Sequence, residues 1–224
     1  MSPQFSGLPL GVKMCVLSAQ EPIARRRVLS AQEPIARRRR EDILVYLALA
    51  RFRKRPPLSK LPLTPQRDMR AFFGSYAKAC AVADDLLFKA GDAAAIDEAC
   101  GRSRVGKILP DDLYVHRTAL EALEPILRIY EGCGRAYLGE VEEANLIKIH
   151  RRSGKISYLV YPDFDTDPHP ALVRCFRLNL RSRQLDCYDY AATANPPILH
   201  RKETRERGAG SGRRRAEGGR RLPG

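Results

Sequence analysis

The sequence lacks several patterns that would assign it to a functional class at once. Its six cysteines, at positions 15, 80, 100, 133, 175 and 187, stand singly, so no C-x-x-C pair or short Cys/His spacing suits zinc. We expect reduced, mostly buried thiols. The longest apolar run, Ile43 to Ala50, is far shorter than the roughly 20 residues of a membrane-spanning helix. The start also lacks the charged and long apolar regions of a secretory signal. These absences predict a cytoplasmic protein with no membrane partner.

Catalytic motifs are also missing. The sequence contains no P-loop, and no Ser/His/Asp or Cys/His arrangement can be recognised from spacing. Residues Glu206 to Gly212 fit the E-x-G-x-G-x-G pattern of a loop that lets the backbone approach S-adenosylmethionine. Such a loop must leave a buried strand and enter a helix, whereas here charged sequence stands on both sides. We therefore predict no catalytic residue and no cofactor for this chain.

Positive charge is abundant but unevenly placed. Residues 1–60 hold 13 Lys and Arg against 4 Asp and Glu, residues 61–200 hold 18 against 19, and residues 201–224 hold 9 against 3. The net charge of +14 therefore lies at the two ends. Basic segments attract DNA backbones through counterion release, which gives non-specific, salt-sensitive binding. The candidate contacts here are Arg37, Arg38, Arg39, Arg40, Arg213, Arg214 and Arg215; the alternative is that both ends are merely solvated.

A direct repeat marks the first part of the chain. Residues 16–27 (VLSAQEPIARRR) recur unchanged at 28–39, too short a unit in too few copies for a solenoid. We predict a disordered Arg-rich arm over residues 1–39, one domain over 40–204, and a disordered Gly/Arg-rich tail over 205–224.

The hydrophobic period predicts an α+β fold for the domain. Helical spacing indicates helices over about 41–50 and 65–89, one that starts at Asp92, and one over 115–137 with a kink at Pro125. After residue 143 the period becomes two, which indicates strands over 144–150, 156–161, 172–180 and 184–190. Their short connections favour an antiparallel four-stranded meander, and we expect the helices of residues 40–143 to cover one face of it.

Three groups of side chains in the strand region could bind ligands. A basic hairpin tip formed by Lys148, His150, Arg151 and Arg152 could meet phosphates, or be an ordinary solvated turn. The cluster Asp163, Asp165, Asp167 and His169 could coordinate Mg²⁺ or Ca²⁺, or be a polar turn whose carboxylates cap amides. Asn195-Pro196-Pro197 matches the N/D-P-P-Y/F element of amino-methyltransferases, which contacts a flipped base, except that Ile198 replaces the aromatic; the alternative is an extended linker.

Long segments of the chain resemble a known family. Residues 40–62, 70–92, 105–133 and 144–204, the last with SYLVYPDFDTDPHPAL and NPPILHRKET, are similar to the C-terminal region of bacterial methyltransferases associated with DNA phosphorothioation. The resemblance implies S-adenosylmethionine as the cofactor of fuller relatives, but the D/E-x-G-x-G cofactor fold that precedes this region in them is not recognisable here. It implies an accessory or truncated member that binds DNA or a protein of the modification system. The alternative is a methyltransferase that is active only when a partner chain supplies the cofactor fold.

Overall fold

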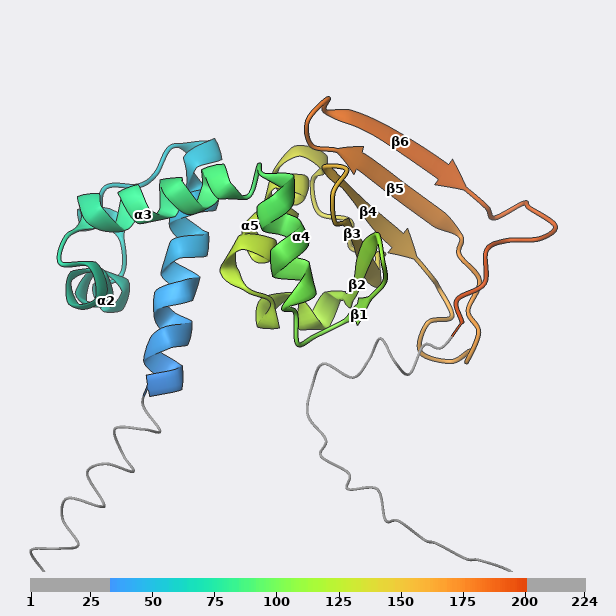
Figure 1. The fold of residues 1–224 in the computed structure, drawn as a ribbon, viewed down its shortest axis with the longest axis horizontal. Helices are drawn as coiled ribbons and strands as arrows, with labels where there is room; N and C mark the ends of the chain where they lie inside the picture. The colour runs from blue at the N-terminus through green and yellow to red at the C-terminus, as the bar shows by residue number, and fades with distance from the viewer. Residues whose placement is uncertain (1–32, 201–224) are drawn as a thin grey trace, which may run out of the picture.

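The structure, a computed structural model, describes residues 33–200. Helices gather at one end and the sheet at the other (Figure 1). The first helix occupies residues 33–50 and is followed by α2 (Leu63–Phe73) and α3 (Tyr76–Lys89). Next come α4 (Ala93–Gly101) and α5 (Pro125–Leu138), which lie between this group and the sheet (Figure 1). Short 3-10 turns cover Arg51–Arg53, Leu58–Lys60 and Arg117–Ala122.

The sheet has six antiparallel strands in sequential order. They are β1 (Lys107–Ile108), β2 (Asp112–His116), β3 (Leu146–His150), β4 (Lys155–Val160), β5 (Arg174–Asn179) and β6 (Gln184–Asp189). The α+β class and the antiparallel meander are confirmed, but the predicted number of four strands is wrong. The two extra strands, β1 and β2, precede the meander, and β2 pairs with β3 along its whole length.

The predicted helix over 115–137 is also wrong in its first half. Residues up to His116 belong to β2, because Leu113 and Val115 alternate with half-buried polar residues and face the core. Pro125 does not kink a helix but begins α5, where its missing N–H removes no intrahelical hydrogen bond.

Two further helix boundaries differ from the prediction. The helix expected over 65–89 is two helices, since Gly74 has a φ of +78° and Ser75 caps α3 by accepting from the Lys78 amide at 3.2 Å. Residues 33–39, predicted as part of a disordered arm, are helical and continuous with residues 40–50. The Asp92 cap is confirmed, with 3.0 Å between its carboxylate and the Ala94 amide. The remaining parts of the predicted arm and tail, residues 1–32 and 205–224, lie outside the described residues.

The two faces of the sheet are covered differently. On one face, side chains of β2 to β5 form the main core with α5; its members include Leu113, Val115, Ile147, Ile149, Ile156, Tyr158, Leu127 and Ile129. On the other face, a smaller cluster covers one end only, where the 161–173 connection and the 190–200 segment fold back; it comprises Leu146, Leu159, Tyr161, Phe164, Leu172, Cys175 and Leu199. No helix of residues 33–200 lies over this second face (Figure 1), which we call the open face.

The structure also bears on the predicted state of the cysteines and on the prediction that no helix spans a membrane. The five cysteines within residues 33–200 are free thiols, of which Cys100 and Cys175 are buried and Cys187 is exposed. Within the same residues, no helix combines the length and the apolar character needed to cross a bilayer.

Candidate nucleic-acid interface

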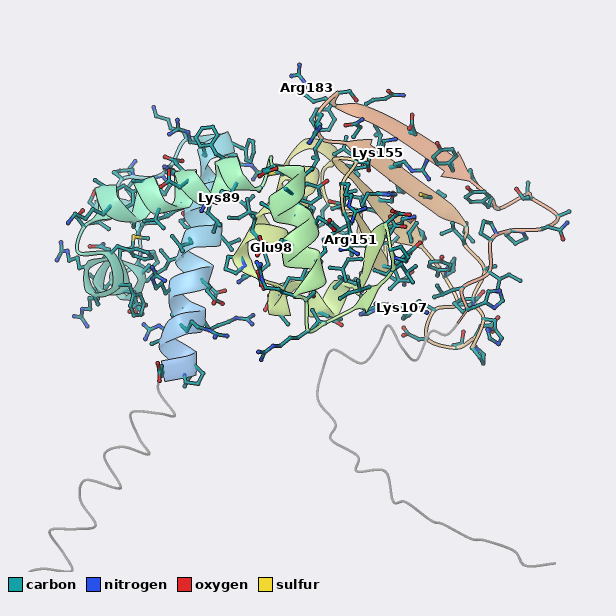
Figure 2. All side chains as sticks on the ribbon, in the orientation of Figure 1. Lys89, Glu98, Lys107, Arg151, Lys155 and Arg183 are labelled. Atoms are coloured by element: carbon teal, nitrogen blue, oxygen red, sulfur yellow. The ribbon has the colours of Figure 1, made fainter. Side chains whose placement is uncertain are left out.

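A single line of paired residues crosses all six strands on the open face. The register joins Lys107 to Tyr114, Tyr114 to Lys148, Lys148 to Ser157, Ser157 to Arg177 and Arg177 to Asp186. Directly opposed residues in antiparallel strands have Cβ atoms about 4.5–5.5 Å apart. Two lysines with a tyrosine between them therefore follow one another across β1 to β3 at the spacing of neighbouring strands, and Ser157, Arg177 and Asp186 continue the line across β4 to β6. Figure 2 shows Lys107 at the β1 end of this line.

A hollow of about 490 Å³ lies over this line, and no carboxylate lines it. Its cationic lining side chains are Lys107, Lys148 and Arg177, and its tyrosines are Tyr114, Tyr161 and Tyr190. Pro197, Ile198, Leu199 and His200 also line it. Three cations line the hollow and no acid does; Asp112 contacts Lys148 and Asp186 lies opposite Arg177, but neither carboxylate is part of the lining, which therefore favours an anionic ligand.

The wall of the hollow beside residues 197–200 is fixed by backbone pairing. The Leu172 amide donates to the Pro197 carbonyl at 2.8 Å, and the Leu199 amide donates to the Pro170 carbonyl at 3.0 Å. Leu199 is buried in the smaller cluster, which anchors the segment to the sheet. The wall is therefore part of the fold and holds its position without a ligand.

Aromatic and cationic side chains contact one another on the open face. The Lys148 ammonium lies 5.3 Å from the centre of the Tyr114 ring, and the Arg177 guanidinium lies 5.0 Å from that of Tyr188. Arg177 also donates from Nη1 to the Tyr188 hydroxyl at 3.3 Å. Its Nε has no hydrogen-bond partner among the described residues, so the guanidinium is not saturated by the protein.

A polar network beside the hollow, on the same face of the sheet, holds Lys148 in place. The Lys148 ammonium is 2.9 Å from Asp112 Oδ2, and His150 Nδ1 is 2.9 Å from Asp112 Oδ1. Burial alone would lower the pKa of Lys148, but the contacts with Asp112 and Tyr114 outweigh it and raise that pKa. Lys148 is therefore a cation held in a fixed position. The contact with Asp112 occupies only part of the three N–H donors of the Lys148 ammonium.

His150 is the neutral member of this network. Burial, followed by the charge of Lys148, lowers the pKa of His150 to about 4, so the ring is uncharged near pH 7. The short contact with Asp112 therefore joins a carboxylate to a neutral ring and is not an ion pair. On its other side, His150 Nε2 is 3.0 Å from the Ser157 hydroxyl.

The order Ser157, His150, Asp112 is that of a hydrolase triad, but the surroundings do not support acyl transfer. Such a reaction needs preorganised donors at the developing oxyanion, commonly backbone N–H groups. Ser157 lies in the middle of β4, whose backbone groups pair with β3 and β5, and the residue is 1% exposed. We interpret the network as support for Lys148.

The structure separates the residues of the predicted basic hairpin. Lys148 and His150 belong to the open face, but Arg151 and Arg152 point to α4 and contact Asp97 at 2.5 and 2.9 Å. Arg151 also donates to the carbonyls of Leu109 and Pro110. Figure 2 shows Arg151 between α4 and the sheet. Arg151 therefore fastens α4 to the β1–β2 and β3–β4 turns, and the four basic residues do not form one phosphate site.

The first four predicted arginines lie on the helix over residues 33–50 and already contact protein groups. Arg37 and Arg38 pair with Glu41 and Asp42 one turn on, at 3.4 and 3.6 Å. Arg39 contacts Asp68 of α2 at 2.6 Å, and Arg40 lies over the Phe73 ring at 5.2 Å. Arg39 and Arg40 therefore help to pack this helix on α2, whereas these pairs of Arg37 and Arg38 lie within their own helix. Arg213, Arg214 and Arg215 lie outside the described residues.

The acidic cluster is an exposed turn. The Asp163 carbonyl accepts from the amides of Thr166 and Asp167, and the Asp167 carboxylate accepts from the His169 amide at 2.7 Å. Within residues 33–200 no group of three or more His, Cys, Asp or Glu side chains is arranged to hold a metal ion. The described geometry of Asp163, Asp165, Asp167 and His169 thus gives the metal prediction no support and matches the capping alternative.

The Asn195-Pro196-Pro197 segment lies next to the hollow. Pro197 lines it, and Ile198, which replaces the aromatic residue of the methyltransferase element, is 52% exposed at the same wall. The structure therefore brings part of this segment and Lys148 to one site. The site prediction missed the lining cations Lys107 and Arg177 and the lining tyrosines Tyr114, Tyr161 and Tyr190. The alternation of β5 could have placed Arg177 on the face opposite Phe176 and Leu178, but β1 and β2 were not recognised as strands.

The described residues do not fit the cofactor that the family resemblance associates with fuller relatives. A Rossmann-like S-adenosylmethionine site needs parallel strands and a glycine turn that leads into a helix. All strand pairs in residues 33–200 are antiparallel. Residues 206–212 lie outside the described chain.

Comparison with known proteins adds no relative, since no protein-family model, no curated protein and no solved structure matches this chain. The fold and the surface alone define the class: an α+β protein with a cationic, tyrosine-lined hollow on one open sheet face.

Proposed function

We propose that this chain is a non-catalytic accessory region or truncated member of the methyltransferase family associated with DNA phosphorothioation, and that it binds DNA through its open face. The observation that carries the binding proposal is the hollow lined by Lys107, Lys148 and Arg177 without a carboxylate. Phosphate contacts by Lys and Arg supply most of the affinity of non-specific DNA binding. The family resemblance supplies the modification system as the context, and proteins of that system are the other partners we expect.

Charge removal at the hollow tests this proposal. We expect Lys107→Gln and Lys148→Gln each to weaken binding of a fluorescent oligonucleotide at low salt about three- to tenfold, roughly the value of one phosphate contact. The control is Lys89→Gln, which removes the same charge from an exposed position at the end of α3 (Figure 2) that does not line the hollow. Equal weakening by all three variants would show that binding depends on overall charge, and unchanged binding at both hollow variants would overturn the proposal. Circular dichroism checks that each variant is folded.

Titration with S-adenosylmethionine separates the accessory role from the alternative of a methyltransferase that needs a partner chain. The accessory role requires no heat of binding from this chain alone in calorimetry. Saturable heat would instead support a cofactor site within the chain.

A further inference from the structure

We infer that the hollow on the open face holds one unpaired nucleotide, so that the chain prefers single-stranded to double-stranded nucleic acid. This inference rests on the proposed function and specifies its ligand. It depends on three independent properties of the site: its shape, its aromatic lining and the placement of its cations.

The shape of the site favours a single nucleotide over a duplex. A hollow of about 490 Å³ has the size of a small-ligand pocket. It is bounded by a wall that backbone hydrogen bonds hold against residues 170–172. Proteins that read the bases of a duplex insert a protruding helix or β-ribbon into a groove of the DNA. The open face is instead concave at the hollow. An extruded base with its phosphate can enter the hollow, whereas a paired base is held in the stack.

The aromatic lining provides a stacking surface that duplex bases cannot reach. Tyr114 and Tyr190 are half-buried, so part of each side chain is exposed to the hollow, while Tyr161 is 5% exposed and closes one side. Base–aromatic stacking stabilises single-strand complexes and tolerates any base, since every base has a π-face. Ile198 adds exposed apolar surface at the wall. The site therefore suits a base of unspecified identity.

The cations stand where the phosphate of a stacked nucleotide can meet them. Lys107 and Lys148 oppose Tyr114 in the paired register, and the Lys148 ammonium lies over the Tyr114 ring at 5.3 Å, so a base would stack on the part of the ring that Lys148 leaves open. Arg177 follows two strands further on and lines the same hollow. Lys148 is held by Asp112 and Arg177 by Tyr188, so both charges are fixed before a ligand binds. This order of cation, ring and cation matches the alternation of phosphate and base along a single strand.

Fluorescence anisotropy with the full chain tests the inference. The probes are a single-stranded oligonucleotide, the duplex of the same sequence, and a single strand with abasic sites in place of its bases. We expect the single strand to bind about tenfold more tightly than the duplex, since one stacked base accounts for such a factor. The abasic strand should lose most of this preference. Equal binding of single strand and duplex would overturn the inference.

Substitution of the tyrosines tests whether the preference for single-stranded nucleic acid arises in the hollow. Tyr114→Leu and Tyr190→Leu keep apolar bulk but remove the ring, and each should weaken single-strand binding about five- to tenfold while leaving duplex binding unchanged. Tyr137→Leu is the matched control, because Tyr137 is 54% exposed on α5 and does not line the hollow. If both Tyr114→Leu and Tyr190→Leu keep the preference for the single strand, the hollow is not the site that binds the unpaired nucleotide.

The outcomes distinguish this inference from the proposed function. If Lys107→Gln and Lys148→Gln weaken duplex and single strand alike while the tyrosine variants change nothing, DNA binding stands and the nucleotide pocket does not. If no oligonucleotide binds at low salt, the proposed function itself fails. A nucleoside monophosphate that binds as tightly as the oligonucleotide would show that the occupant is a free nucleotide, which also overturns the inference.

Discussion

At the scale of single residues, His150 is the group whose charge depends most clearly on the fold. Its pKa of about 4 lies below the ordinary value of 6.5, because burial and then the neighbouring Lys148 disfavour the protonated ring. The unfolded chain therefore binds a proton more readily than the folded one between these two pH values. The stabilisation from a neutral His150 is complete above pH 6.5 and is lost as the pH falls toward 4.

We predict that the free energy of unfolding falls by about 2 kcal/mol more in the native chain than in a His150→Gln variant between pH 6.5 and 5, at 1.36 kcal/mol per pH unit. Urea unfolding at both pH values measures the difference. An NMR titration should show that the His150 ring is still neutral at pH 5.5. Parallel pH profiles of the two proteins would contradict the assignment.

Arg55 is a side chain that connects the helix over residues 33–50 to α3. Its Nε donates to the Leu47 carbonyl at 2.7 Å, and its two terminal nitrogens contact the Asp84 carboxylate at 3.0 and 2.5 Å. The side chain is 12% exposed, so solvent competes little. The hydrogen bond from Arg55 holds the pKa of Asp84 below its ordinary value.

We predict that Arg55→Lys lowers the free energy of unfolding by about 1–3 kcal/mol, because an ammonium keeps the charge but loses the paired geometry. Arg51→Lys is the control: Arg51 contacts the same carboxylate at 3.6 Å but is 61% exposed, so we expect a change below about 0.5 kcal/mol. Chemical denaturation measures the free energy of unfolding of both variants. Equal losses would show that the paired contact between Arg55 and Asp84 has no special role.

At the scale of elements, α5 is the helix that joins the two ends of the molecule, and two glycines allow its close packing. A Cβ at Gly132 would lie 2.5 Å from a Leu49 methyl on the helix over residues 33–50. A Cβ at Gly134 would lie 2.6 Å from the Tyr158 hydroxyl oxygen of β4. Positions two apart project to nearly opposite sides of a helix, so α5 has one narrow contact on each side.

We predict that Gly134→Ala destabilises the fold by about 1–3 kcal/mol, since Tyr158 is buried and cannot move without disturbing the core. Gly101→Ala in α4 makes the same change where the nearest atom from another part of the chain, Nη2 of Arg151, is 4.0 Å away. That control should be neutral or slightly stabilising, because alanine favours helix over glycine. Thermal unfolding of the two variants tests the prediction; a Gly134→Ala protein as stable as the control would rule out a tight contact.

At the scale of the whole molecule, the excess of positive charge and the proposed binding site belong to different parts of the chain. The excess of positive charge lies at the ends, whereas the tyrosine-lined hollow belongs to the nearly neutral middle. Non-specific attraction depends on the number of phosphates neutralised and is therefore sensitive to salt. Stacking on tyrosine depends much less on salt.

We predict that replacing Arg213, Arg214 and Arg215 together with Gln reduces the slope of log affinity against log salt by up to about 2–3, near 0.7–0.9 for each lost phosphate contact. The ratio of single-strand to duplex affinity should stay the same. Oligonucleotide binding from 50 to 300 mM salt measures both quantities. A changed ratio with an unchanged slope would place these arginines at the selective site.

Local patterns predicted the strands well and the helix boundaries less well. The alternation over 144–190 placed β3 to β6 within a few residues, because burial of one sheet face imposes a period of two. Gly74 was overlooked as a break, since the apolar stripe continues across it from α2 to α3. β2 was missed because its five residues carry only two core positions, Leu113 and Val115; its last two residues fell in the helix predicted over 115–137, and its first three were assigned to no element.

The amino-acid sequence by itself determined the α+β class, the antiparallel order of β3 to β6 and the location of charge, because each follows from local period or composition. The tertiary structure alone decided which basic residues share a surface. Strand pairing brings Lys107, Tyr114 and Lys148 into one line, although about 40 residues separate the first from the last. The same pairing turns Arg151 away toward Asp97. Contacts between residues far apart in the chain depend on register, and one missed strand removes them from a prediction based on sequence alone.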